Sequence, residues 1–255
     1  MAPPRLQESW DNTGWQVVPC LTTEKCTGVL CCLDVTPAVV QEAIELGCNL
    51  IVSHHPLIFR GLKCVSRATP ASEAAIMAIQ GGVAIYSSHT ALDSCPQGPS
   101  AWLASHLGLG QTRVLAPDPS DPSVGLGIIG SLPEAISHDE LIGRVNDVYG
   151  GFIRHTPGPA NGGEVRTVAL CSGSGGEFIP RAIALGADAY ITSDIRYHDF
   201  LDRGGELILV DTGHFESEIC TKSIFSRIIS EKFPNFAVHM CRCEHAPASY
   251  AVNRQ

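Results

Sequence analysis

The sequence has no long apolar run and few basic residues. Its 255 residues include 17 Lys and Arg against 26 Asp and Glu, which gives a formal net charge of −9. No apolar stretch approaches the roughly 18 residues of a membrane-spanning helix, and residues 1–10 carry prolines and charges where a signal peptide has an apolar core. The scattered lysines and arginines form no basic stripe for a phosphate backbone. We therefore expect a cytoplasmic globular protein that binds neither a membrane nor nucleic acid directly.

The sequence also lacks a CxxC pair, although it contains 11 cysteines. Their number is odd, and a chain of this length does not need disulfides to stabilise its fold. Several lie in apolar segments, where a reduced thiol behaves as a small core side chain. These are Cys31, Cys32, Cys48 and Cys171. A reducing compartment fits this usage better than a disulfide framework.

One cysteine cluster lies near the C-terminus. Cys241, Cys243 and His245 are ligand types that a soft metal accepts. No fourth ligand follows at the spacing of a zinc finger, so we interpret the segment as a terminal strand with incidental thiols.

The two halves of the chain resemble each other. Residues 43–55 (AIELGCNLIVSHH) match residues 182–194 (AIALGADAYITSD). With one adjustment, GGVAIYSSHTALD from residue 81 matches GGELILVDTGHFESE from residue 204. In both halves short apolar strands alternate with helices, which predicts βαβ units and a mostly parallel sheet. The fold class that follows is α/β, with two facing pseudo-repeated βαβ units.

Individual elements follow from capping and breaking residues. Thr36 can cap a helix whose first position is Pro37, and Gly47 ends it. The expected strands are residues 28–34, 49–53, 83–87, 165–171, 189–192 and 207–210. The expected helices are residues 37–46, 71–80 and 178–185, and residues 172–176 (SGSGG) are expected to form a turn.

The segment between the halves has a different character, because it is rich in Pro, Gly and Ser at its edges. A strand at 125–132 and a capped amphipathic helix at 137–149 predict a small inserted β/α element. The expected organisation is a first α/β repeat at 1–109, the insert at 110–164 and a second repeat at 165–255 that completes the site.

Chemically distinctive residues follow the predicted strands, where open α/β sheets gather their ligands. The chain places His54 and His55 after one strand and Asp194 after its counterpart in the other repeat. The pattern His-x-x-x-carboxylate occurs twice at equivalent positions, in pairs that are His89 with Asp93 and His214 with Glu218. Imidazoles and carboxylates together suit Zn, Fe or Mn ions, and a carboxylate can bridge two ions about 3.5–4 Å apart.

These residues also have structural interpretations. If the strand simply continued, His54 and His55 would point in opposite directions, and only one of them could bind the metal directly. Pro56 favours instead a turn in which both side chains reach the site. His89 can orient Asp93 or carry a proton instead of binding metal. Residues 172–176 can cradle a phosphate but lack the lysine of a P-loop. Around Asp194, the polar residues Tyr197, His198 and Asp199 suit either substrate contact and acid–base chemistry or a helix-start network.

Six motifs together resemble one family. They are WDNTGW from Trp10, SHHPLIF from Ser53, SSHTALD from Ser87, CSGSGG from Cys171, SDIRYHDF from Ser193 and DTGHFESE from Asp211. In this order they resemble the NIF-three-like family, whose members are often called GTP cyclohydrolase I type 2 homologues, nearly from end to end. The resemblance implies a two-domain α/β protein that forms a toroidal homohexamer, with a dinuclear metal site that faces the internal cavity.

Transferred residue by residue, the resemblance implies His54, His55, Asp93, His214 and Glu218 as ligands of two divalent ions. This is the set that the internal repeat also indicates. Compared with the family pattern, the chain starts only a few residues before Trp10, so its N-terminus is expected to be shortened, and its middle insert is the short form.

The functional hypothesis is a dinuclear metal-dependent hydrolase in which His89 or His198 moves protons. Its expected substrate is a guanine nucleotide or another phosphorylated small molecule. The alternative is a metal-binding regulatory protein without turnover. Open metal sites with additional histidines beside them favour the enzyme, because structural sites tend to have closed ligand shells.

Overall fold

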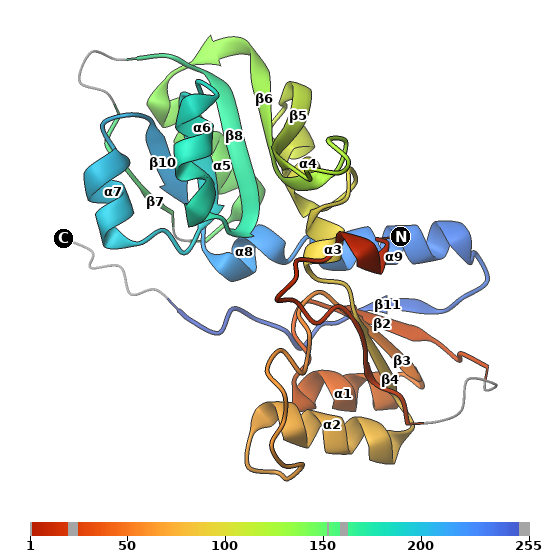
Figure 1. Cartoon of the computed structure of the whole chain (residues 1–255). Helices are drawn as coiled ribbons and strands as arrows, with labels where there is room; N and C mark the ends of the chain where they lie inside the picture. Colours follow the sequence, from red (N-terminus) through yellow and green to blue (C-terminus); the bar gives the residue numbers. More distant parts are fainter. Residues whose placement is uncertain (1, 20–24, 152, 159–162, 250–255) are drawn as a thin grey trace. The chain divides into compact units, whose positions relative to one another are not determined.

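The computed structural model describes residues 2–19, 25–151, 153–158 and 163–249, which form two compact α/β units. The first unit comprises residues 1–92 and 219–245, and the second comprises residues 93–218 and 246–255. Each unit is built on a sheet of its own (Figure 1). No helix in the described ranges is long and apolar enough to cross a membrane. The predicted α/β class with two units is confirmed.

The sheet of the first unit has five strands in the order β1-β4-β3-β2-β11. Strands β2, β3, β4 and β11 run parallel, and β1 pairs antiparallel with β4 at one edge. The strands are β1 (Gly14–Val17), β2 (Val29–Cys32), β3 (Leu50–Ser53), β4 (Ala84–Ser87) and β11 (Val238–Met240). The helical segments are η1 (Pro4–Leu6), α1 (Pro37–Glu45), α2 (Pro70–Gly81), α3 (Thr90–Asp93), whose last residue begins the second unit, and α9 (Thr221–Lys232).

Capping and burial explain why α1 forms and where it packs. The Thr36 side chain accepts a hydrogen bond from the Val39 amide, Pro37 occupies the first turn, and Gly47 has a positive φ of 70° just after the helix. The buried face of α1 packs with α2 against the sheet, and α9 covers the sheet's other face (Figure 1). Strands β2, β3 and β4 lie side by side and run parallel. The residues that follow them therefore lie together at the carboxyl ends of these strands.

The sheet of the second unit has six strands in the order β5-β6-β8-β9-β10-β7. Its centre, β8-β9-β10, is parallel, and the flanking strands pair antiparallel. The strands are β5 (Gly110–Pro117), β6 (Gly125–Ile136), β7 (Arg154–His155), β8 (Val165–Ser174), β9 (Ala189–Ser193) and β10 (Ile208–Asp211). The helical segments are α4 (Pro99–His106), α5 (His138–Tyr149), η2 (Gly176–Phe178), α6 (Ile179–Ala184), α7 (Tyr197–Arg203) and α8 (His214–Glu218).

Three features differ from the arrangement expected from the sequence ranges. The segment at 110–164 supplies β5, β6 and β7 to the same sheet as β8, so it belongs to one layer with the second repeat. The residues of α9 and β11 return to the first unit, where β11 pairs with β2. Strand β8 also continues to Ser174 with an irregular register, where residues 172–176 were expected to turn.

Candidate metal-binding site

Three histidines lie close together at the carboxyl ends of strands in the first sheet. His54 and His55 follow β3 directly, and His89 follows β4, whose Ser87 lies beside Ser53 in the parallel register. The ring centroids are 5.1 Å apart for His54 and His55, 5.2 Å for His54 and His89, and 5.5 Å for His55 and His89. One ring nitrogen of each lies within 4.8 Å of the other two. The strand therefore ends before His54, as Pro56 suggested, and both adjacent imidazoles reach the same cluster.

Each imidazole of this cluster is oriented through its Nδ1 atom. His54 Nδ1 lies 3.2 Å from the Ser88 carbonyl oxygen, and His55 Nδ1 lies 2.8 Å from Asp34 Oδ1. His89 Nδ1 lies 2.8 Å from Asp11 Oδ1. An oxygen acceptor at Nδ1 favours the tautomer with its proton there and its lone pair on Nε2, which is the usual arrangement of metal-ligating histidines.

Asp11 is held in an unusually dense set of hydrogen bonds. Besides His89, its carboxylate accepts from the Thr90 amide and hydroxyl at 3.1 and 2.6 Å and from the Thr13 hydroxyl at 2.9 Å. Burial alone would raise the pKa of this carboxyl, but the hydrogen bonds from His89 and Thr90 outweigh it and hold the pKa well below its ordinary value. Asp11 is therefore a permanent anion behind His89.

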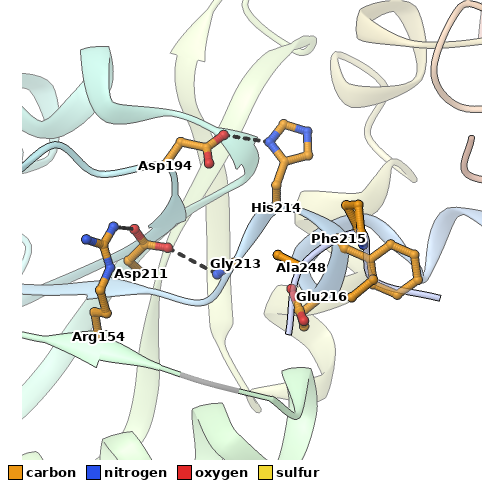
Figure 2. A pocket seen from close by; sticks show the side chains of 10 residues that line it. Arg154, Asp194, Asp211, Gly213, His214, Phe215, Glu216 and Ala248 are labelled. Atoms are coloured by element: carbon orange, nitrogen blue, oxygen red, sulfur yellow. Dashed lines mark hydrogen bonds and ion pairs between the residues drawn. The ribbon is translucent and has the colours of Figure 1, made fainter. Parts of the chain in front are cut away.

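The second unit carries an equivalent histidine on α8. His214 Nδ1 lies 2.7 Å from Asp194 Oδ2, and His214 Nε2 lies 3.0 Å from the Glu218 carboxylate one helical turn later. Figure 2 shows the Asp194 carboxylate directed at the His214 ring. With metal–ligand bonds of about 2.1 Å, two neighbouring ligands of an octahedral ion lie about 3 Å apart. The spacing of His214 and Glu218 fits two ligands of one ion.

Asp194 adopts a backbone conformation that is rare for its residue type. Its φ is 56°, in the left-handed region, immediately after β9. Such conformations persist where the surrounding structure imposes them and concentrate at functional sites. Here the conformation accompanies the hydrogen bond to His214, which resembles the Asp34 contact with His55 in the first unit.

The Glu218 side chain packs directly on a glycine of β8. A Cβ atom on Gly173 would stand 2.1 Å from Glu218 Oε1, so no other residue fits without displacing the carboxylate. Gly173 has a φ of 69°, and its amide donates to the Ser217 hydroxyl at 3.0 Å. The SGSGG motif therefore seats α8 and its carboxylate.

Asp93, the last residue of α3, shares its surroundings with Glu218. Burial raises the pKa of the Cys171 thiol strongly, and the Asp93 and then the Glu218 carboxylate raise it further by their charge. Both carboxylates therefore act on the same point in β8. Asp93 and Glu218 are also the residues at which the chain enters and leaves the main segment of the second unit.

A cavity of about 400 Å³ opens beside His214 in the second unit. Figure 2 shows Arg154 beside Asp211 on the cavity wall, with Asp194 and His214 nearby. The Arg154 guanidinium pairs with Asp211 and donates to the Ile195 carbonyl oxygen at 2.9 Å, while half of its side chain stays exposed. The remaining lining comes from Gly213, Phe215, Glu216 and Ala246 to Ala248. This cavity has the volume of a small-molecule site.

His198 occupies a different position from the other candidates. It lies exposed on α7, with its ring 5.4 Å from that of Tyr197, while Asp199 accepts hydrogen bonds from Arg196. The structure thus provides the helix-start network for the group after Asp194. The imidazole partners Asp11 and Asp34 received no role from the sequence, although Asp11 lies in the WDNTGW motif and Asp34 is the last residue of the strand predicted at 28–34.

Known proteins with similar sequences belong to one family. The family model described as Duf34/NIF3 (NGG1p interacting factor 3) matches residues 1–247. A Nostoc protein named GTP cyclohydrolase 1 type 2 homolog is 37% identical over 224 residues, covering 83% of each chain. A Schizosaccharomyces pombe protein named NIF3 homolog is 30% identical and covers 86% of this chain and 84% of its own.

Solved structures show the same fold. A Staphylococcus aureus hypothetical protein superposes with a TM-score of 0.89 at 25% identity, covering 98% of this chain and 95% of its own. A Bacillus cereus protein related to NIF3 superposes with a TM-score of 0.88 at 24% identity, with coverages of 98% and 96%. The chain therefore belongs to the Duf34/NIF3 family.

Proposed function

We propose that this protein is a metal-dependent hydrolase with two divalent ions, Zn, Fe or Mn, held by His54, His55, Asp93, His214 and Glu218. The main observation in support is the shared orientation of the imidazoles of His54, His55 and His214. In three of these five residues, Nδ1 faces an oxygen acceptor, namely the Ser88 carbonyl, Asp34 or Asp194. This contact prepares a neutral Nε2 ligand. The donor set of imidazole nitrogens and carboxylate oxygens fits such ions.

The positions of the carboxylates support the same set. Asp93 and Glu218 both act by their charge on the Cys171 thiol, so both carboxylates lie near one point of β8, and carboxylates can bridge two ions. Bound divalent ions would polarise a substrate oxygen and activate a water molecule at neutral pH. The protein's own contribution is to orient the imidazoles through their Nδ1 contacts and to seat the Glu218 carboxylate against Gly173.

His89 is proposed to move protons rather than to complete the ligand set. Its Nδ1 lies 2.8 Å from Asp11 Oδ1, and this contact orients the ring so that Nε2 can exchange a proton. A histidine that can hold a proton beside a ligand cluster suits a general acid or base. His198, exposed on α7, is the second candidate for this role.

The proposed substrate is a nucleotide, such as a guanine nucleotide, or another phosphorylated small molecule. Arg154 supports this class, because its half-exposed guanidinium can donate to a phosphate from the cavity beside His214. Relatives named GTP cyclohydrolase 1 type 2 homolog point to the same class. We also propose that the protein forms a homohexamer. Light scattering, which measures the mass of the assembly in solution, tests this.

The second candidate function is that of a non-catalytic metal-binding regulatory protein. A Saccharomyces cerevisiae relative, 30% identical over 213 residues, carries the name NGG1-interacting factor 3. A partner-binding role would use the same metal site without turnover.

The test combines metal analysis with turnover. Chelator-free, untagged wild type is compared with Asp93→Ala and with Asp147→Ala, which removes an exposed carboxylate on α5. We expect about two transition ions per chain in wild type and in the control, and clear loss in Asp93→Ala. Nucleotides and phosphoesters are then screened with the loaded proteins.

The outcomes separate the two functions. Turnover that disappears in Asp93→Ala supports the hydrolase. Full metal content without turnover favours the regulatory protein, for which partner pull-downs follow. Little metal in wild type, or equal metal in wild type and Asp93→Ala, would overturn the proposed site.

A further inference from the structure

A second cluster of metal-ligating groups lies in the first unit, on residues that the proposed hydrolase does not use. Cys241 Sγ lies 3.4 Å from Cys243 Sγ and 3.0 Å from Glu42 Oε2. One ligand atom of each of the three lies within 4.8 Å of the other two. Glu42 belongs to α1, and the two cysteines follow β11.

The sheet explains how these distant residues meet. Strand β11 adds to β2 in parallel, and the pairing extends to Cys241, whose amide donates to the Cys31 carbonyl oxygen at 2.9 Å. The chain bends at Arg242 and Cys243, just after β11, and this brings both thiols to the Glu42 carboxylate of α1. The sequence does not reveal the role of Glu42, because nothing at this half-buried helix position indicates a contact 199 residues away.

Backbone hydrogen bonds hold the Glu42 carboxylate in place. It accepts from the Arg242 amide at 2.9 and 3.1 Å and from the Cys243 amide at 3.1 Å. Burial on its own would raise the pKa of Glu42, but the thiol and amide hydrogen bonds lower it to about 2. A fixed anion therefore stands beside the two thiols at neutral pH. The neighbouring Lys222 and Glu244 pair with each other at 3.1 Å.

We propose that Glu42, Cys241 and Cys243 form a binding site for a thiophilic divalent cation of the Zn²⁺ or Cd²⁺ class. With metal–sulfur bonds of about 2.3 Å and metal–oxygen bonds of about 2.1 Å, tetrahedral ligands lie about 3.6–3.8 Å apart. The observed sulfur–sulfur spacing of 3.4 Å and sulfur–oxygen spacing of 3.0 Å would each need to open by roughly half an ångström. Because Cys243 is exposed, an ion can enter and a water molecule can take the fourth position.

Binding exchanges protons for the cation. A cysteine thiol ordinarily carries its proton at neutral pH, whereas the metal ligand is the thiolate. Two S–H bonds break as two metal–thiolate bonds form, and two protons pass to solvent without any change of oxidation state. His245 takes no part in the proposed ligand set, since its Nδ1 lies 3.1 Å from the Cys243 carbonyl oxygen.

The test uses a signal that only thiolate ligands give. Full-length protein, reduced and freed of metal, is titrated anaerobically with Cd²⁺ while the ultraviolet thiolate-to-metal charge-transfer absorbance is recorded. We expect the absorbance to saturate at one ion per chain, with about two protons released. Cys243→Ser should abolish it, and Glu42→Gln should weaken the affinity roughly tenfold.

Controls keep this result separate from the hydrolase site. Cys64→Ser removes another exposed thiol and should retain the charge-transfer signal. Asp93→Ala should also retain this signal, because a loss of metal in that variant concerns only the proposed hydrolase site. Cys243 is chosen over the buried Cys241 so that folding is preserved, which circular dichroism verifies. No charge-transfer band in wild type, or an unchanged band in Cys243→Ser, would overturn the proposal.

Discussion

The contact between Gly173 and Glu218 gives a prediction whose size follows from the structure. In Gly173→Ala, the new Cβ would stand 2.1 Å from Glu218 Oε1, and the residue must keep a φ of 69°. The left-handed conformation costs alanine about 1–2 kcal/mol. Turning the Glu218 side chain away adds about 1 kcal/mol. We therefore expect the free energy of unfolding to fall by about 2–3 kcal/mol and metal affinity to fall about 10–100-fold.

A second glycine separates the two effects. Gly186, just after α6 in the same unit, has a φ of 75°, and a Cβ there would meet nothing within 4 Å. Gly186→Ala should lose only the backbone cost of about 1–2 kcal/mol and keep its metal affinity. Urea unfolding measures the stability of both variants, and competition with a chromophoric chelator measures metal binding. Equal metal affinities in the two variants would refute the role of Gly173 in seating the Glu218 carboxylate.

Three further predictions concern single side chains. Asp194→Asn keeps a residue that tolerates the φ of 56° but removes the charge behind His214, so metal affinity should fall about tenfold in chelator competition; an unchanged affinity contradicts that role. At pH 8, iodoacetamide should modify exposed Cys64 while Cys171 stays unmodified, because burial and the charges of Asp93 and Glu218 raise the Cys171 pKa. Equal labelling of the two cysteines in peptide mass spectra would disprove this. Ile51→Ala, at a fully buried core position, should lower the free energy of unfolding in urea by about 3 kcal/mol. Ile79→Ala, at an exposed position, should lower it by less than about 0.5 kcal/mol, and similar losses in the two variants would contradict the core position of Ile51.

Local signals in the sequence were sufficient for the repeated elements. Thr36, Pro37 and Gly47 mark both ends of α1 by capping, fixed φ and positive φ, and the predicted helix at 37–46 is observed as Pro37–Glu45. The strand predicted at 49–53 is observed as Leu50–Ser53, and that at 189–192 as Ala189–Ser193. Such elements depend on residues within a few positions of each other, which a single sequence contains.

Contacts between distant segments were beyond the sequence. Gly173 was expected in a turn, yet β8 continues to Ser174 because the irregular pairing with β9 accommodates its left-handed backbone. The partners that orient the histidines, Asp11 and Asp34, come from other loops, and no local pattern connects Asp11 with His89. The return of β11 to β2 likewise depends on which sheet edge is open, and not on the sequence of β11 itself.

The nested order of the two units has a consequence for synthesis on the ribosome. All strands of the second sheet have been made by Asp211, whereas the first sheet waits for β11 at Val238–Met240. Domains generally fold as units while the chain emerges, so the segment translated in the middle can complete its sheet before the segment translated first. Until then, β2 presents an unpaired edge of the kind that recruits foreign strands. A chain that stops after Glu218 would retain this edge permanently and should aggregate, although it contains every residue of the proposed hydrolase site.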